Sequence, residues 1–154
     1  MKEIKMALQL EKDGYAYYKK AAELCPNEYG KKMFEKLSKD EIEHLAKFKE
    51  IAEEIFGKIE EGQGKHLDIF EKIDFSSKSG EYDALRHAIE FEERARKFFE
   101  ESAKKAKNER IRELFQRIAK EEEMHKELLE AELNYLQKSG VWFDYQEFRM
   151  DSFS

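Results

Sequence analysis

The sequence has few of the residues that cross-link chains, break helices or anchor a protein in a membrane. Its 154 residues include one cysteine and one proline. The lone Cys25 cannot form an internal disulfide, which fits a reducing compartment, and it excludes an iron centre of the Cys-x-x-Cys type. The longest apolar runs are a few residues, far short of the ~20 that span a bilayer, and the charged amino terminus lacks a signal-peptide hydrophobic region. We therefore expect a cytoplasmic protein that does not enter a membrane.

An excess of basic residues is also missing. The chain has 29 Lys and Arg against 35 Asp and Glu, which gives a net charge of −6, and the two signs are interspersed. Because no basic stripe is present to bind a phosphate backbone, nucleic acid is not an expected partner. A length of 154 residues suits a single domain with one core.

Four stretches place apolar or small residues at helical spacing, at residues 3–24, 29–56, 81–107 and 109–138. Pro26 and Asn27 separate the first two, and Gly57 ends the second. Short links make antiparallel neighbours, whereas residues 57–80, which hold four of the seven glycines, form a long crossover. The expected fold is therefore all-α, a ferritin-like four-helix bundle over residues 1–138 with one long crossover between its second and third helices.

Two further apolar segments lie outside these four helices. Residues 67–75 are expected to form a short turn of helix lying on the bundle. Residues 139–154 form an aromatic tail, which we expect to cover a bundle end or a partner subunit, as in a homodimer, because such side chains are unfavourable in water. The tail contains Val141, Trp142, Phe143, Tyr145 and Phe148.

The two halves of the chain repeat each other. A shift of 81 residues carries Glu11 onto Glu92, Glu41 onto Glu122 and His44 onto His125. Apolar positions follow the same shift: Ala7 and Ala88, Leu8 and Ile89, Leu10 and Phe91, Tyr17 and Phe98, Tyr18 and Phe99, Phe34 and Phe115, Leu37 and Ile118, and Phe48 and Leu129. The pattern indicates two helical hairpins about a pseudo-two-fold axis, each carrying Glu and then Glu-x-x-His.

The six repeated polar residues are expected to meet inside the bundle. Each glutamate lies about 15 residues, or roughly 22 Å, from the turn of its own hairpin, so paired helices bring the glutamates to one level. On each helix the polar ligands fall within the apolar stripe. Four carboxylates and two imidazoles are costly to bury alone, and two divalent cations would match the four negative charges. The set suits two iron ions, and manganese or zinc could occupy the same cage.

Other acids and histidines compete for these roles. A single Glu-x-x-His is weak evidence in so acidic a chain, and His66 and His87 lack the pattern, so we interpret both as surface or packing residues. Glu90 and Glu93 flank Glu92, but the repeat and the apolar stripe both select Glu92. Tyr18 is by default a core residue, although its hydroxyl could hold a ligand carboxylate.

Four motifs resemble those of the rubrerythrin branch of the ferritin-like di-iron proteins, over residues 1 to about 138. They are LEKDGYAYY, DEIEH, FEERARKFF and EEEMH, which begin at residues 10, 40, 91 and 121. Tyr18, seven residues after Glu11, matches a tyrosine that rubrerythrins place near the metals. The resemblance implies a non-haem di-iron centre that reduces hydrogen peroxide to water, with both irons cycling between the ferrous and ferric states.

The chain departs from that family in two ways. Rubrerythrins carry a second glutamate three residues after the ligand of the third helix, where this sequence has Ala95. The cysteine-bearing rubredoxin-like domain that delivers electrons in full-length members also has no counterpart here. The resemblance therefore implies an external electron-donor protein and puts the redox-linked ligand exchange of the family in doubt.

Three functions remain open from the sequence. In the first, a peroxide reductase, Glu41 and Glu122 bridge or chelate the irons, one histidine binds each iron, and Glu11 and Glu92 complete the coordination. The second is a ferroxidase or iron-handling protein that oxidises ferrous iron with oxygen. The third is a metal-free helical interaction module.

Overall fold

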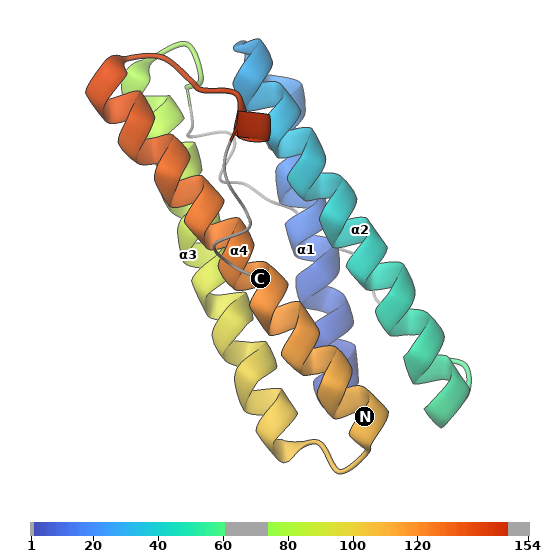
Figure 1. Cartoon of the computed structure of the whole chain (residues 1–154). Helices are drawn as coiled ribbons and strands as arrows, with labels where there is room; N and C mark the ends of the chain where they lie inside the picture. Colours follow the sequence, from blue (N-terminus) through green and yellow to red (C-terminus); the bar gives the residue numbers. More distant parts are fainter. Residues whose placement is uncertain (1, 61–73, 148–154) are drawn as a thin grey trace.

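Four long helices make up nearly all of the described chain. The structure is a computed structural model that describes residues 2–60 and 74–147. The helices are α1 (Lys2–Leu24), α2 (Glu28–Phe56), α3 (Lys78–Lys105) and α4 (Glu109–Ser139), and a short 3-10 helix, η2 (Tyr145–Glu147), follows them (Figure 1). The predicted all-α class and the four predicted helices are confirmed.

The helices pack as two antiparallel hairpins. α1 packs along α2 and α3 packs along α4, while α1 also meets α3 and α2 meets α4. α2 and α4 run in opposite directions, because Phe48 stacks on Phe115 whereas the earlier Asp40 reaches the later His125. α3 therefore begins at the end of the bundle opposite to the end of α2, as Figure 1 shows. This confirms the ferritin-like arrangement with one long crossover.

Side-chain caps set where the helices begin. The Asn27 side chain accepts hydrogen bonds from the amides of Tyr29 and Gly30, and the Asn108 side chain accepts one from Ile111. Each asparagine satisfies amides that have no partner within the first helical turn, so α2 and α4 start directly after it.

Glycines end two of the helices. Gly57 and Gly140 follow α2 and α4 with φ of 85° and 79°. Residues with a Cβ rarely adopt such positive φ values, so glycine is favoured at both positions. These ends agree with the predicted ones to within a residue.

The predicted limits of the third helix, 81–107, were wrong at both ends. α3 begins at Lys78, because the Ser77 side chain accepts a hydrogen bond from the amide of Gly80 and caps the helix three residues earlier. It ends at Lys105, and Ala106 has an extended backbone.

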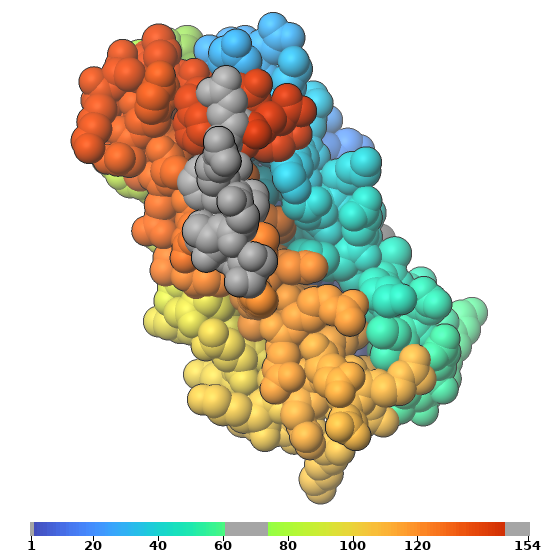
Figure 2. Space-filling model, viewed as in Figure 1, coloured from blue at the N-terminus to red at the C-terminus, as the bar shows by residue number. Residues whose placement is uncertain are grey.

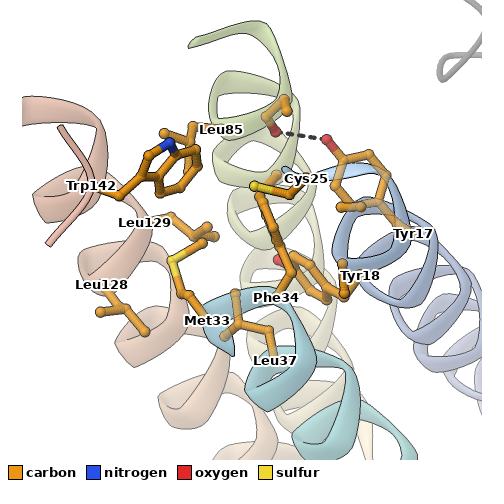
Figure 3. Close-up of a cluster of buried hydrophobic side chains, with 14 of the residues drawn as sticks. Tyr17, Tyr18, Cys25, Met33, Phe34, Leu37, Leu85, Leu128, Leu129 and Trp142 are labelled. Carbon is orange, nitrogen blue, oxygen red and sulfur yellow. Dashed lines mark hydrogen bonds between the residues drawn. The ribbon is translucent and has the colours of Figure 1, made fainter. Parts of the chain in front are cut away.

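Two apolar cores fill the bundle, one toward each end. The Trp142 core, drawn in Figure 3, contains Tyr17, Tyr18, Ala21, Ala22, Cys25, Met33, Phe34, Leu37, Phe75, Ala84, Leu85, Ala88, Leu128, Leu129, Leu136 and Trp142. The Phe99 core contains Ile4, Ala7, Leu8, Leu45, Phe48, Ala52, Ile59, Ala95, Phe99, Ala103, Ile111, Leu114, Phe115, Ile118 and Ala119. The six repeated polar residues lie on the helix turns between these two cores.

The first part of the aromatic tail lies against the end of the bundle. Trp142 is buried, its ring centroid lies 6.0 Å from that of Phe34, and its indole N–H donates to the Glu81 carboxylate. The amide of Phe143 donates to Glu132 Oε1 at 3.3 Å. In Figure 2 residues 141–147, in red, lie between the end of α4 and the start of α2.

Some sequence expectations fall beyond the described residues. Phe148 and most of the apolar patch at 67–75 lie there, although Phe75 is described and its ring meets Phe34 in the Trp142 core. Within residues 2–60 and 74–147, none of the helices is long and apolar enough to cross a bilayer.

Candidate metal centre

All four helices contribute candidate metal ligands to one buried cluster, which we call the cage. Its members are Glu11 on α1, Glu41 and His44 on α2, Glu92 on α3, and Glu122 and His125 on α4. They form two overlapping groups, one of Glu11, Glu41, His44 and Glu122 and one of Glu41, Glu92, Glu122 and His125, and within each group the ligand atoms lie within 4.8 Å of one another. The structure therefore brings together all six residues that the repeat selects, with Glu41 and Glu122 shared between the groups.

The apolar stripes of the helices aim these side chains inward. Helical spacing places Glu41 and Glu122 three or four residues from the core positions Leu37 and Ile118, so both carboxylates share the buried face. Each of the four glutamates is at most 1% exposed.

Gly14 makes room at the level of the cage. A Cβ at this position would lie 2.9 Å from a ring carbon of Phe91 and 3.0 Å from Glu41 Oε2. The absence of a side chain thus lets α1 approach both the phenylalanine and the shared carboxylate.

Each histidine directs one ring nitrogen into the cage. His44 Nδ1 lies 3.5 Å from Glu11 Oε2 and 3.5 Å from Glu122 Oε1. His125 Nδ1 lies 3.3 Å from Glu41 Oε1, 3.4 Å from Glu92 Oε1 and 3.6 Å from Glu122 Oε1. The two imidazoles are nearly parallel, 6.0 Å apart and at 19°. Nδ1 of His44 thus faces the carboxylates of the first group, and Nδ1 of His125 faces those of the second.

The other nitrogen of each histidine is held by a carboxylate that the sequence analysis missed. His125 Nε2 lies 3.0 Å from Asp40 Oδ2, and His44 Nε2 contacts Glu121. Each contact joins the two hairpins: the acid precedes the shared glutamate on α2 or α4, and the histidine is on the other of these two helices. An acid that accepts from the outer nitrogen fixes the ring and leaves Nδ1 free as a ligand. The 81-residue shift could have found them, since it carries Asp40 onto Glu121.

Tyr18 holds one ligand carboxylate. Its hydroxyl donates to Glu92 Oε1 at 2.5 Å, and the residue is fully buried. The shift of 81 residues carries Tyr18 onto Phe99, which has no hydroxyl to offer Glu11. Ala95, where the family pattern has glutamate, is buried in the Phe99 core and supplies no ligand. The two halves of the cage are therefore alike in their ligands and unlike in their surroundings.

The donor atoms of the cage fit a pair of divalent cations. Among the described residues nine inward atoms have no hydrogen-bond partner: both oxygens of Glu11, Glu41 and Glu122, Oε2 of Glu92, and Nδ1 of His44 and His125. Buried polar atoms almost always have hydrogen-bond partners. Nine unpartnered atoms in one place therefore indicate a site for a bound group. Carboxylate oxygen with imidazole nitrogen is a donor set for iron, manganese or zinc.

Crowding of like charges shifts the carboxyl groups apart. Burial, and then the charge of Glu122, raise the pKa of Glu92 to about 8. Burial also raises the pKa of Glu11, and it raises that of Glu41 well above the usual range with the help of the Glu11 charge. Glu122 is the exception, since the nearby histidines outweigh burial and lower its pKa. In the protein alone, protons therefore neutralise part of the cage, and cations would replace them.

Burial acts on the pKa of the histidines in the opposite direction to its effect on the glutamates. Burial alone would lower their pKa, but neighbouring carboxylates outweigh it, raising the pKa of His44 to about 12 and that of His125 to about 10. The pKa of Asp40 falls to about 2, because its partners His125 and Lys36 outweigh burial. The carboxylates around the two imidazoles therefore favour positive charge at this position.

A pocket leads from the surface to the outer side of both histidines. It has a volume of about 220 Å³ and lies between α2 and α4. Its lining residues are Lys36, Asp40, Glu43, His44, Glu121, Met124, His125 and Leu128. A molecule the size of peroxide or oxygen fits this space.

The competing residues lie elsewhere. Glu90 is exposed, and Glu93 pairs with Arg96 and Lys126 on the surface of α3 and α4. His87 is half-buried on α3 and belongs to neither ligand group, and His66 is outside the described residues.

Comparisons with known proteins agree with this geometry. A family model described as Rubrerythrin matches residues 2–82 and 83–149. A solved structure of a hypothetical protein from Pyrococcus furiosus has 22% sequence identity and a TM-score of 0.73, over 88% of this chain and 89% of that one, which bears on the fold alone. A search of curated proteins found no match.

Proposed function

The chain belongs to the rubrerythrin family, whose members have a ferritin-like di-iron domain, and from this premise we propose that it is a di-iron peroxide reductase supplied with electrons by an external donor. One observation supports the metal centre of this proposal above the others. Nine inward ligand atoms without hydrogen-bond partners lie in two overlapping groups of described residues. A metal-free interaction module gains nothing from burying such a set.

Each residue has a distinct part in this proposal. Glu41 and Glu122 belong to both groups and would bind both irons, while Glu11 with His44 and Glu92 with His125 would each complete one side. Bound iron supplies two one-electron couples, which match the two electrons that peroxide takes up. Asp40 and Glu121 keep the imidazoles oriented, so Nδ1 stays inside the cage.

The surroundings favour reaction of a small molecule. The two apolar cores exclude water on either side of the cage, and the pocket between α2 and α4 is the access route. Reduction of peroxide breaks the O–O bond and uses two electrons and two protons to form two waters. Protons can arrive from solvent through the polar pocket, whose walls include Lys36 and Glu43.

Anaerobic stopped-flow spectroscopy tests the proposal. The protein is loaded with ferrous iron and mixed with hydrogen peroxide or with dissolved oxygen at equal concentration. We expect reoxidation to be faster with peroxide. Equal or slower reoxidation with peroxide would remove the main support for a peroxide reductase.

A ferroxidase is the second candidate, and the pocket supplies a reason to consider it. Three carboxylates, Asp40, Glu43 and Glu121, line the way to the cage and would attract ferrous ions. Repeated oxidation of added ferrous iron beyond the two sites of each chain, together with assembly into a large hollow shell, would favour this function over peroxide reduction.

A further inference from the structure

The oxidisable side chains around the cage are distributed unequally. The Trp142 core contains Tyr17, Tyr18 and Trp142, whereas the aromatic residues of the Phe99 core are all phenylalanines: Phe48, Phe99 and Phe115, with Phe91 and Phe98 packed against them. Phenylalanine is far harder to oxidise than tyrosine or tryptophan. In the described residues, only one end of the bundle therefore offers redox-active rings beside the cage.

Three of the aromatic rings of this core, Tyr18, Phe34 and Trp142, form a row of contacts, and Figure 3 labels all three. The Tyr18 hydroxyl donates to Glu92, a proposed ligand, and the Tyr18 ring stacks on Phe34 at 6.3 Å and 24°. The Phe34 ring meets Trp142 at 6.0 Å and 68°. Electron tunnelling falls steeply with distance, and one intervening ring in contact with both neighbours keeps each step short.

The internal repeat shows that packing alone does not require these residues. The 81-residue shift carries Tyr17 and Tyr18 onto Phe98 and Phe99, and Phe99 is as fully buried as Tyr18. Phenylalanine therefore fills the equivalent space. The hydroxyl of Tyr18 adds a buried polar group that filling the space does not require, and its hydrogen bond to Glu92 Oε1 satisfies it.

We propose that Tyr18, Phe34 and Trp142 form a one-electron route between the metal centre and the end of the bundle, with Trp142 as the point where electrons from the external donor enter. This inference rests on the proposed function and adds the path that its external donor needs. The acceptor at the far end is the centre oxidised by peroxide, and the reductant is a one-electron donor, either a reduced redox protein or a small organic reductant.

Charge and atoms balance along the route. When Tyr18 gives up an electron, its phenol proton passes to Glu92 Oε1 along the existing hydrogen bond, and it returns when Tyr18 is reduced. Trp142 supplies that electron while Glu81 accepts from its indole N–H, and the donor then reduces Trp142. Two such transfers and two protons from solvent convert one peroxide to two waters, and two donor molecules are each oxidised by one electron.

The end of the bundle suits this role of Trp142. The indole is 4% exposed, but the preceding Val141 is 54% exposed, so a donor on this surface lies one residue from the ring. Lys78 lies 3.7 Å from Glu81 and exposes its ammonium group beside the same site. Tyr17 offers an alternative branch that the variants below distinguish, because its ring lies 5.5 Å from that of Tyr18 and its hydroxyl donates to the Ala84 carbonyl.

Pulse radiolysis of the zinc-loaded full chain tests the route without iron or peroxide. Zinc fills the cage and is redox-silent. Radiolytically produced azide radicals oxidise tryptophan selectively, and Trp142 is the sole tryptophan. We expect the tryptophyl absorption to decay at a rate independent of protein concentration while tyrosyl absorption rises. Here the electron moves from Tyr18 to Trp142, the reverse of the proposed direction, and the electronic coupling is the same both ways. Tryptophyl decay without tyrosyl formation would overturn the proposal.

Variants assign the path. Tyr18→Phe should abolish the tyrosyl signal, and Phe34→Leu should slow its formation, whereas Tyr135→Phe, on the exposed face of α4, should leave it intact. Loss of the signal in Tyr17→Phe with retention in Tyr18→Phe would place the route on the other branch and contradict the proposal. Circular dichroism of each variant checks that the bundle is folded.

The inference and the proposed function fail separately. If peroxide does not outpace oxygen in reoxidising the iron-loaded protein, the peroxide reductase is wrong whatever the zinc experiment shows. If reoxidation by peroxide is fast but the zinc-loaded chain shows no transfer from Trp142 to Tyr18, the route is wrong and the function stands.

Discussion

Each hairpin contributes three candidate ligands of the same types, two glutamates and a histidine, but the residues that support them differ between the hairpins. On one side, Tyr18 holds Glu92 and Asp40 holds His125, with Lys36 on Asp40 at 2.7 Å. On the other, Glu121 holds His44, and Phe99 occupies the place of the tyrosine. In the proposed site, charge balance with two cations accounts for the carboxylates and imidazoles in both halves. Nothing in that balance fixes the neighbours, so they can differ and make the two sides of the cage inequivalent.

The largest expected effect is loss of bound metal, and it should differ between ligands that belong to both groups and ligands that belong to one. Glu122→Gln removes a carboxylate that belongs to both groups, so both metals should be lost, whereas Glu11→Gln affects a ligand of one group and should leave one metal in place. Elemental analysis of metal per chain after dialysis measures both. Glu90→Gln, on the exposed face of α3, is the matched control and should retain the full content. Equal loss in Glu122→Gln and Glu11→Gln would show that the ligands are not shared as we infer.

The next effect compares the two carboxylates that hold the histidines. Asp40→Asn and Glu121→Gln should each weaken metal binding, by about 10- to 100-fold for a residue that orients a ligand. The loss of metal affinity should be greater for Asp40→Asn. The Asp40 side chain is 24% exposed against 39% for Glu121, so water can replace Glu121 more easily as the hydrogen-bond partner of its histidine. Competition with a chromophoric chelator gives the affinities. A greater loss in Glu121→Gln than in Asp40→Asn would contradict this ranking.

A smaller effect concerns the tyrosine present on one side alone. Tyr18→Phe leaves Glu92 Oε1 buried without its donor, which should lower the free energy of unfolding by about 1–3 kcal/mol. Chemical denaturation of the zinc-loaded protein measures it. Tyr135→Phe removes an exposed hydroxyl and should change stability little. If the two variants were equally stable, the hydrogen bond to Glu92 would have no net value.

The smallest expected effect is a pH dependence of the free energy of unfolding that arises at one end of the bundle, from Glu132. Burial raises the pKa of Glu132 to about 8, although the Phe143 amide opposes this, and the 81-residue shift places Glu132 on Ile51 in the other half. A carboxyl with a raised pKa in the folded state favours folding below its unfolded pKa of 4.5, and that contribution is lost as pH rises toward 8.

The free energy of unfolding should therefore fall more between pH 6 and 9 in the unsubstituted chain than in Glu132→Gln, whose side chain cannot ionise. Urea titrations across that range measure the difference. A parallel pH dependence in both proteins would mean that Glu132 does not carry the effect.

Sequence periodicity was enough to predict the fold and the six residues that converge in the cage. The apolar stripes gave the buried face of each helix, the link lengths gave the crossover, and the repeat selected Glu92 over Glu90 and Glu93. Such patterns have a clear physical basis, because each depends on spacing along one helix. The same repeat contained Asp40 and Glu121, whose roles could have been predicted from it.

Contacts between helices were harder to predict. The partner of Tyr18 proved to be Glu92 on α3, and periodicity along α1 cannot say which carboxylate lies opposite a buried hydroxyl. The contact of Trp142 with Glu81 joins residues 61 positions apart for the same reason. The early start of α3 depends on a single cap by Ser77, which apolar spacing does not register.

The number of metal ions bound per chain is the most direct test of the account. Anaerobic titration of the metal-depleted chain with ferrous iron, followed by separation of free metal and elemental analysis, gives this number. The account predicts two ions per chain, one for each of the two overlapping ligand groups. A chain that binds one ion or none, while remaining folded, would contradict it.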